Sequence, residues 1–85
     1  MHDDSLITQI REIMADTFGT DEAELPASPS QATYARWTSV LHMVLLVALE
    51  EQFAVSFSMD EMTSMTSLEH ILDVLRSKEV VGLPA

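Results

Sequence analysis

The chain has 85 residues, of which 14 are acidic and 4 are basic, so its formal net charge at pH 7 is −10. A chain of this length can bury one modest hydrophobic core, and we therefore expect a single domain (1–85) without a large catalytic cleft. Apolar residues make up 47% of the sequence, which is typical of a folded domain and not of a disordered one. The negative charge argues against nucleic acid and anionic lipid as partners and favours proteins with basic docking surfaces.

The sequence contains no cysteine, which excludes disulfides, thiolate metal sites and a built-in thiol nucleophile. Its acidic runs also lack the spaced oxygen ligands of a calcium loop, and no metal site is expected. The N-terminal segment is acidic and amphipathic, unlike a signal peptide, and the longest apolar run, residues 43–49, is too short to span a bilayer. These features predict a cytoplasmic protein that does not bind membranes.

The first predicted helix is amphipathic and extends to about residue 18. Its apolar face is formed at helical spacing by Leu6, Ile10, Ile13 and Met14. We expect Asp3 or Asp4 to cap its N-terminus and Gly19 to end it. The next stretch, residues 19–37, contains two prolines and no helical period. It is predicted to be one long connection across a helical bundle.

The second predicted helix begins at Thr38 or Ser39 and is apolar almost all round. A helix with so small a polar face must be covered on more than one side. The broad face expected to pack on the first and last helices consists of Leu45, Leu46, Leu49 and Phe53. The opposite face consists of Val40, Val44 and Val47, with Glu51 beside them. We expect this second face either to be covered by a loop or to be kept for a partner.

Two further helices are predicted towards the C-terminus. Ser58 and Glu61 have the spacing of a capping box, which indicates a short helix over residues 59–64. A second capping box is predicted at "TSLE", residues 66–69, in front of the last helix. The apolar face of that last helix consists of Leu68, Ile71, Leu72 and Leu75.

These elements predict an all-α fold, a four-helix bundle of three main helices and one short helix, with a helical core at about 4–77 and a tail at 78–85. In this order of elements, and above all in "WTSVLHMVLLVALEEQFAVSFSMDEM" (37–62), the chain resembles the acyl carrier proteins, in the free-standing form of specialised metabolism. The resemblance implies that Ser39 carries 4'-phosphopantetheine, which a phosphopantetheinyl transferase adds from coenzyme A. It also implies a monomer that catalyses nothing itself and presents acyl or aminoacyl thioesters to loading enzymes and synthases, in a polyketide, nonribosomal peptide or related pathway.

The surroundings of Ser39 bear on this interpretation in two ways. A phosphodiester on Ser39 would lie at a helix N-terminus, where unpaired amides and the helix dipole favour an anion. On local sequence alone, Ser39 or Thr38 could simply cap the helix. Thr38 also stands where the family has an aspartate, so modification is expected to be slower or even absent. If it is absent, the chain is an unmodified bundle that serves as a protein-docking module.

Docking of partner enzymes is expected on the exposed side of the second helix and on acidic residues near it. The expected docking residues are Thr38, Val40, Leu41, Val44, Val47, Glu50, Glu51, Asp60 and Glu61. Leu41 and Val44 replace residues that are often acidic in the family, so recognition is expected to depend more on apolar contact. A DNA-binding helix is excluded because residues 39–53 contain no Lys or Arg.

Several other side chains near Ser39 are expected to have structural roles. Ser39 and His42 are three residues apart, but no orienting acid or oxyanion hole supports a nucleophile and base, and His42 is expected to be packed near the arm. Trp37 and Tyr34 are expected to anchor the long loop. The methionines, Met59, Met62 and Met65 among them, are either core fillers or the lining of an adaptable cavity for a bound chain.

Overall fold

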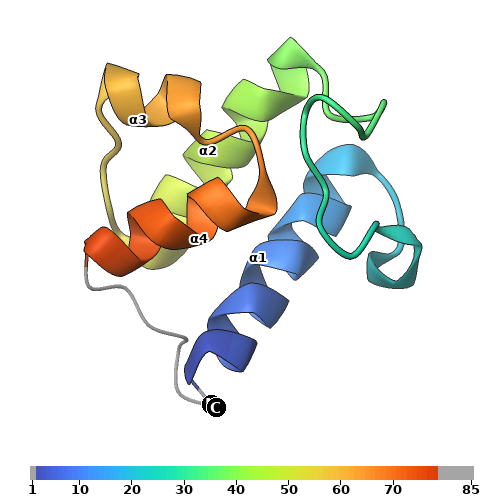
Figure 1. The fold of residues 1–85 in the computed structure, drawn as a ribbon, viewed down its shortest axis with the longest axis horizontal. Helices are drawn as coiled ribbons and strands as arrows, with labels where there is room; N and C mark the ends of the chain where they lie inside the picture. Colours follow the sequence, from blue (N-terminus) through green and yellow to red (C-terminus); the bar gives the residue numbers. More distant parts are fainter. Residues whose placement is uncertain (1, 79–85) are drawn as a thin grey trace.

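The computed structural model describes residues 2–78, and its helices are labelled in Figure 1. The elements are α1 (His2–Phe18), the 3-10 helix η1 (Glu22–Glu24), α2 (Ser39–Phe53), α3 (Met59–Ser64) and α4 (Leu68–Ser77). The described chain forms no strand, and the predicted all-α bundle is confirmed. The tail predicted at 78–85 lies, except for Lys78, outside the described residues. Over the same residues, no helix combines the length and apolar character needed to cross a membrane.

The two ends of α1 differ in how well they follow the prediction. The helix begins at His2, so the predicted cap at Asp3 or Asp4 is wrong and both residues lie inside the first turn. No helix breaker separates these residues from the apolar periodic part, so the helix extends through them. At the other end, Gly19 adopts the left-handed conformation with φ 68°, and the amide of Thr20 donates to the carbonyl of Ala15 at 3.0 Å. Gly19 therefore ends α1 as predicted.

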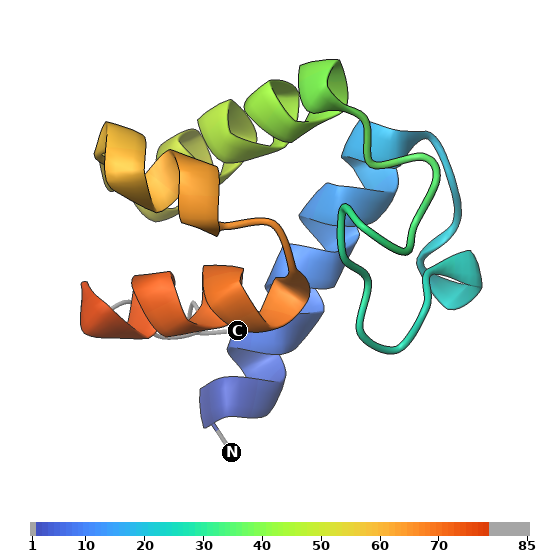
Figure 2. The ribbon, with the colours of Figure 1, turned by 45° about the horizontal axis from the view of Figure 1, so that its top comes forward.

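Figure 2 shows α2 and α4 arranged around α1, and the core is formed by the side chains that these helices bury against one another. Its fully buried members include Leu6, Ile10 and Met14 of α1, Trp37 of the long connection, Leu45, Leu46 and Leu49 of α2, Met65, and Ile71 and Leu75 of α4. The broad apolar face of α2 is thus buried as predicted. Burial of this apolar surface is the main favourable contribution to the stability of the fold.

The long connection between α1 and α2 is held against the end of α1. Arg11 of α1 donates to the carbonyl of Pro26 at 2.7 Å, which fixes the middle of the connection. Phe18 packs edge-on against Tyr34 and lies 5.5 Å from Trp37 between ring centroids. Trp37 is only 2% exposed. The predicted anchoring of the loop by Trp37 and Tyr34 is confirmed, and it fixes the point at which α2 begins.

The capping box predicted at residues 66–69 is wrong, because α4 begins one residue later than it requires. The N-cap is Ser67, whose hydroxyl accepts from the amide of His70 at 3.1 Å. Ser67 also forms an isolated antiparallel bridge with Ser30 of the long connection. This pairing keeps the backbone extended up to Ser67, and the helix therefore begins at Leu68.

Candidate functional site

At the N-terminus of α2, one residue caps the helix and the next one presents an exposed hydroxyl. Thr38 is the N-cap, and its side chain accepts from the amide of Leu41 at 3.2 Å. Ser39 is the first helical residue and is exposed. Within residues 2–78 the Ser39 hydroxyl makes no hydrogen bond. Of the two residues that the sequence offered as the cap, Thr38 therefore makes the capping bond, and the Ser39 hydroxyl is exposed.

The backbone around Ser39 is suited to an anionic substituent. The amides of Ser39 and Val40 belong to the first turn, in which N–H groups have no helical acceptor, whereas the amide of Leu41 is already satisfied by Thr38. The positive end of the α2 dipole adds a favourable field at the same place. A phosphodiester on the Ser39 oxygen would meet both the unpaired amides and this field, so the residues present fit such a group.

A groove of about 380 Å³ lies beside Ser39, between α2 and α3. It is lined by Gln31, Ser39, His42, Met43, Met59, Met62, Thr63 and Thr66. Met65, in contrast, is fully buried in the core. Met65 is thus a core filler, while Met43, Met59 and Met62 line the groove with soft, adaptable apolar surface.

His42 is buried between the long connection and α3, with 8% of its surface exposed. The indole Nε1–H of Trp37 donates to Nδ1 of His42 at 3.0 Å. On the other side of the ring, Nε2 lies 2.9 Å from the carbonyl oxygen of Met62. The expectation that His42 is a packed residue is confirmed. Because Nδ1 accepts from the indole and Nε2 faces a carbonyl oxygen, neither ring nitrogen is available to take a proton from Ser39.

The exposed side of α2 is apolar and uncovered in the described structure. Val40 is 74% exposed, and Val44 and Val47 are about half exposed. Leu41 is partly buried and packs against the core. Of the two alternatives for this face, cover by a loop is thus wrong, because the long connection packs on α1 instead.

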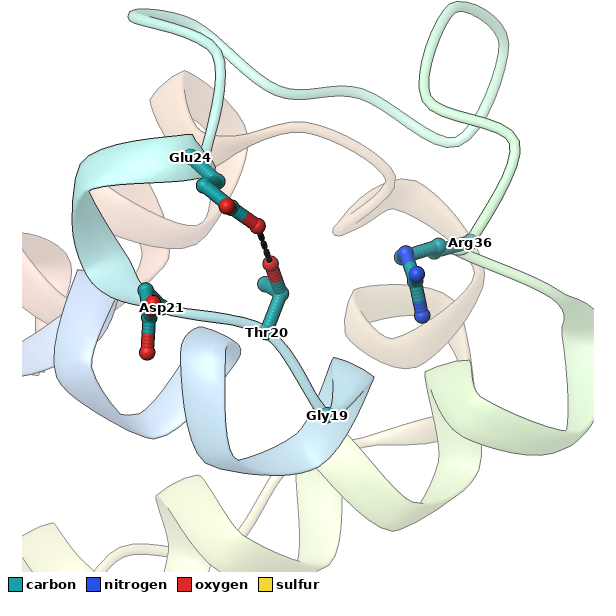
Figure 3. Close-up of a pocket in the computed structure, with 5 residues that line it drawn as sticks. All are labelled: Gly19, Thr20, Asp21, Glu24 and Arg36. Carbon is teal, nitrogen blue, oxygen red and sulfur yellow. Dashed lines mark hydrogen bonds between the residues drawn. The ribbon is translucent and has the colours of Figure 1, made fainter.

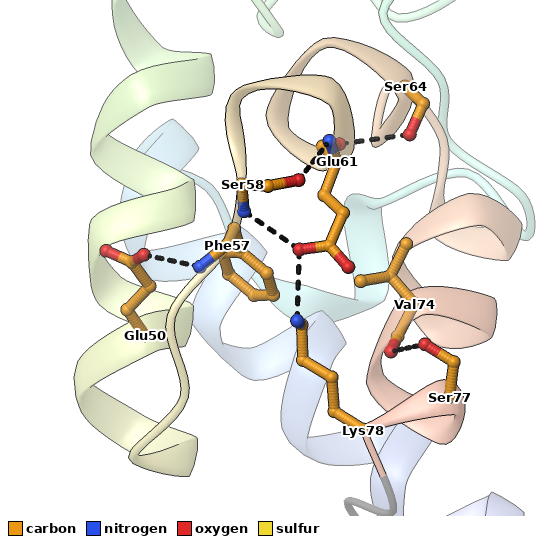
Figure 4. A network of polar contacts seen from close by, with 8 residues as sticks. All are labelled: Glu50, Phe57, Ser58, Glu61, Ser64, Val74, Ser77 and Lys78. Carbon is orange, nitrogen blue, oxygen red and sulfur yellow. Dashed lines mark hydrogen bonds and ion pairs between the residues drawn. The ribbon is translucent and has the colours of Figure 1, made fainter.

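Two of the four acidic residues expected at the docking surface are bound within the fold, as Figure 4 shows. Glu50 accepts from the amide of Phe57 at 2.9 Å. Glu61 accepts from the amide of Ser58 at 2.8 Å, and the Ser58 hydroxyl accepts from the amide of Glu61, so the predicted capping box of α3 is confirmed. Lys78 lies 3.0 Å from Glu61. The hydrogen bond from the Ser58 backbone, followed by the contacts with Lys78, lowers the pKa of Glu61.

The other two acidic residues, Glu51 and Asp60, are exposed, and their carboxylates make no bond within the described chain. Their charges therefore face solvent next to the apolar side of α2 and at the start of α3. The pair formed by Glu61 and Lys78 was not predicted from the sequence. The two residues are 17 positions apart, and no local pattern links them.

A second hollow, of about 320 Å³, lies where α1 ends. It is lined by Gly19, Thr20, Asp21, Glu24 and Arg36, which Figure 3 shows. The Thr20 hydroxyl donates to Glu24 at 2.9 Å, and Arg36 donates to the carbonyl of Phe18 at 3.3 Å. These polar groups hold the start of the long connection. Across the described residues, no cluster of three acidic or histidine side chains could hold a metal ion.

A small helical bundle with one free serine at a helix N-terminus, beside an apolar groove, has the architecture of a carrier protein. No protein-family model matches the chain. The polyketide-8 synthase acyl carrier protein 2 of Streptomyces avermitilis is 31% identical to it over 70 residues, which are 82% of this chain and 80% of that protein. The chain therefore belongs to the acyl carrier protein family, as its sequence pattern predicts.

Proposed function

We propose that this protein carries acyl intermediates of polyketide biosynthesis on a 4'-phosphopantetheine arm attached to Ser39. The observation that carries the proposal is the Ser39 hydroxyl, which is exposed and free because Thr38 already caps α2. The name of the Streptomyces relative supports the choice of pathway. When bound, the arm supplies the terminal thiol that this cysteine-free chain lacks and on which an acyl group is held as a thioester.

The residues at the start of α2 would act together in holding the arm. Ser39 would supply the oxygen of the phosphodiester, and the amides of Ser39 and Val40 would stabilise its negative charge with the help of the helix dipole. Thr38 keeps the first turn in place through its bond to Leu41, although it lacks the carboxylate common in the family. Loss of that carboxylate therefore does not displace Ser39, and we expect modification to occur, at a lower rate than with an aspartate at this position.

The groove next to Ser39 supports a role in handling apolar cargo. Three methionine side chains, those of Met43, Met59 and Met62, line it. Because methionine is flexible and polarisable, the lining could adapt to chains of different shape. The attachment point and the groove are adjacent, and a chain bound at Ser39 would have apolar surface within reach.

Docking of the transferase and the synthase enzymes is proposed on the valine face of α2, which consists of Val40, Val44 and Val47. Glu51 and Asp60 would supply exposed negative charge around it, with Leu41, Glu50 and Glu61 at the margin. All four basic residues have partners within the fold, as Arg11 binds Pro26, Arg36 binds Phe18, Arg76 pairs with Asp73 and Lys78 binds Glu61. A partner with an apolar centre and a basic rim fits this surface best. Tethering then raises the effective concentration of the cargo at each enzyme.

The proposal is tested by the intact mass of the protein before and after incubation with coenzyme A and a broad-specificity phosphopantetheinyl transferase. We expect a gain of one phosphopantetheine group in the wild type and none in Ser39→Ala. The variant should fold normally, with a change in the free energy of unfolding below about 0.5 kcal/mol, since the exposed Ser39 hydroxyl bonds to no other described residue. If several transferases leave the folded wild type unchanged, the unmodified docking module becomes the better interpretation.

A further inference from the structure

The starting observation is a chain of two hydrogen bonds that joins three parts of the fold, here called the Trp37–His42–Met62 latch. Trp37 ends the long connection, His42 lies in the first turns of α2, and Met62 belongs to α3. The indole nitrogen of Trp37 lies 3.0 Å from His42 Nδ1, and the carbonyl oxygen of Met62 lies 2.9 Å from His42 Nε2. Trp37 and His42 are both buried, so water competes poorly for these bonds.

The partners of the ring determine where its proton is. An indole N–H can only donate, and His42 Nδ1 must therefore be the unprotonated acceptor. A backbone carbonyl can only accept, which requires a proton on Nε2 that is donated to Met62. The latch is complete only when His42 is the neutral tautomer with hydrogen on Nε2.

The bond to Met62 matters for α3 because this helix is short. With six residues, α3 cannot be stable without tertiary contacts. The carbonyl of Met62 lies in its last turn, and the amide four positions on, that of Thr66, donates to Ser64 instead. His42 thus satisfies a carbonyl that the helix leaves without a donor.

No charged side chain hydrogen-bonds to the imidazole within the described chain. On α2, Glu50 is occupied by the amide of Phe57 and Glu51 is exposed. On α3, Glu61 binds Lys78, and Asp60 is also exposed. The long connection contributes only the uncharged indole to the ring, and the histidine of α4, His70, bonds to Ser67. A protonated His42 would therefore be a buried cation without a carboxylate partner.

We propose that His42 is a positioning residue whose neutral ring ties α3 to the start of α2 and sets the groove beside Ser39. When a proton from solvent adds to the lone pair of Nδ1, the new N–H faces the indole N–H of Trp37, and the bond between them is lost. The ring then leaves its buried site, releases the carbonyl of Met62 and loosens α3. The groove opens because Met59, Met62 and Thr63, which form one of its walls, move with that helix.

The first test is the imidazole ¹⁵N spectrum of the wild-type protein at neutral pH. We expect His42 in the tautomer with hydrogen on Nε2, and the opposite tautomer overturns the proposal. The second test is hydrogen exchange of the amides of residues 62–65, expressed as protection factors over a pH series. Protection should fall about tenfold as His42 becomes protonated, in line with the loss of one buried hydrogen bond.

Three variants make the exchange experiment specific. His42→Gln offers one acceptor and one donor at every pH, and should retain protection of α3 without a pH step. Trp37→Phe removes the donor to Nδ1, so protonation no longer breaks a bond and the step should shrink. His70→Gln is the matched control on α4 and should keep the step. A pH step that survives in a folded His42→Gln protein overturns the proposal. Ser39 takes no part in these measurements, so their outcome is distinct from that of the modification test.

Discussion

Lys78 Nζ lies 3.0 Å from Glu61 Oε1 and so joins the residue that follows α4 to the first turn of α3 (Figure 4). The same carboxylate oxygen accepts from the amide of Ser58 at 2.8 Å. The Lys78 ammonium also lies 5.8 Å from the centroid of the Phe57 ring. One ion pair thus links α3 to the end of α4, on the side of the bundle that faces away from the long connection.

Glu61→Gln is predicted to make stability less dependent on pH. The pKa of Glu61 in the folded protein is lowered, first by the Ser58 backbone and then by Lys78, so its contribution is complete above the ordinary carboxyl pKa. That contribution is lost as the pH falls through the lowered pKa. Thermal unfolding followed by circular dichroism should give the wild type a higher Tm than Glu61→Gln at pH 7. This difference in Tm should disappear in acid. Asp60→Asn, at an exposed position, should show a much smaller effect; a gap independent of pH would contradict the prediction.

Leu46→Ala is predicted to lower the free energy of unfolding by about 3 kcal/mol, because it leaves a cavity in the core. Leu46 is fully buried, whereas its neighbour Val47 is half exposed. Val47→Ala is therefore the control and should change the same free energy by less than about 0.5 kcal/mol. Urea unfolding measures both. Equal losses in the two variants would show that the assignment of the two faces of α2 is wrong.

Thr38→Ala is predicted to cost about 1 kcal/mol of stability because it removes the acceptor for the Leu41 amide. Thr38→Asp keeps an acceptor at the N-cap and adds a charge that the helix dipole favours, so it should be at least as stable as the wild type. Ser39→Ala is the neighbouring control. If Ser39→Ala destabilises the protein more than Thr38→Ala in the same urea titration, the capping role belongs to Ser39.

Glu51→Lys is predicted to slow the transfer of the arm several-fold at low ionic strength, if the docking surface is as proposed. The difference from wild type should shrink as salt is added, because exposed charges are screened. Glu51 is preferred to Glu50 for this test, since Glu50 also holds the Phe57 amide and its reversal would disturb the fold. Glu69→Lys changes the net charge equally on α4 and is the control. Equal rates for both variants across the salt series would rule out the proposed dock.

The helices and their apolar faces could be predicted because both follow from spacing along the chain. Periodicity identified the buried face of α2. The tolerance of glycine for positive φ correctly predicted that α1 ends at Gly19. Caps were predicted less reliably. The box of α3 was found at Ser58, but that of α4 was misplaced because the bridge between Ser30 and Ser67 delays the helix. Nothing in the local pattern around Ser67 signals a partner in a distant loop.

The sequence by itself determined the class of fold, the family and the candidate serine, since these depend on composition, on helical spacing and on a contiguous motif around Ser39. Only the tertiary structure decided that Thr38 makes the cap, that methionines of two helices form one groove, and that His42 links Trp37 to Met62. The physical reason is the range of the interactions. Helical periodicity and turn chemistry act between near neighbours, whereas a groove or a buried hydrogen-bond chain forms only when packing brings separate segments together.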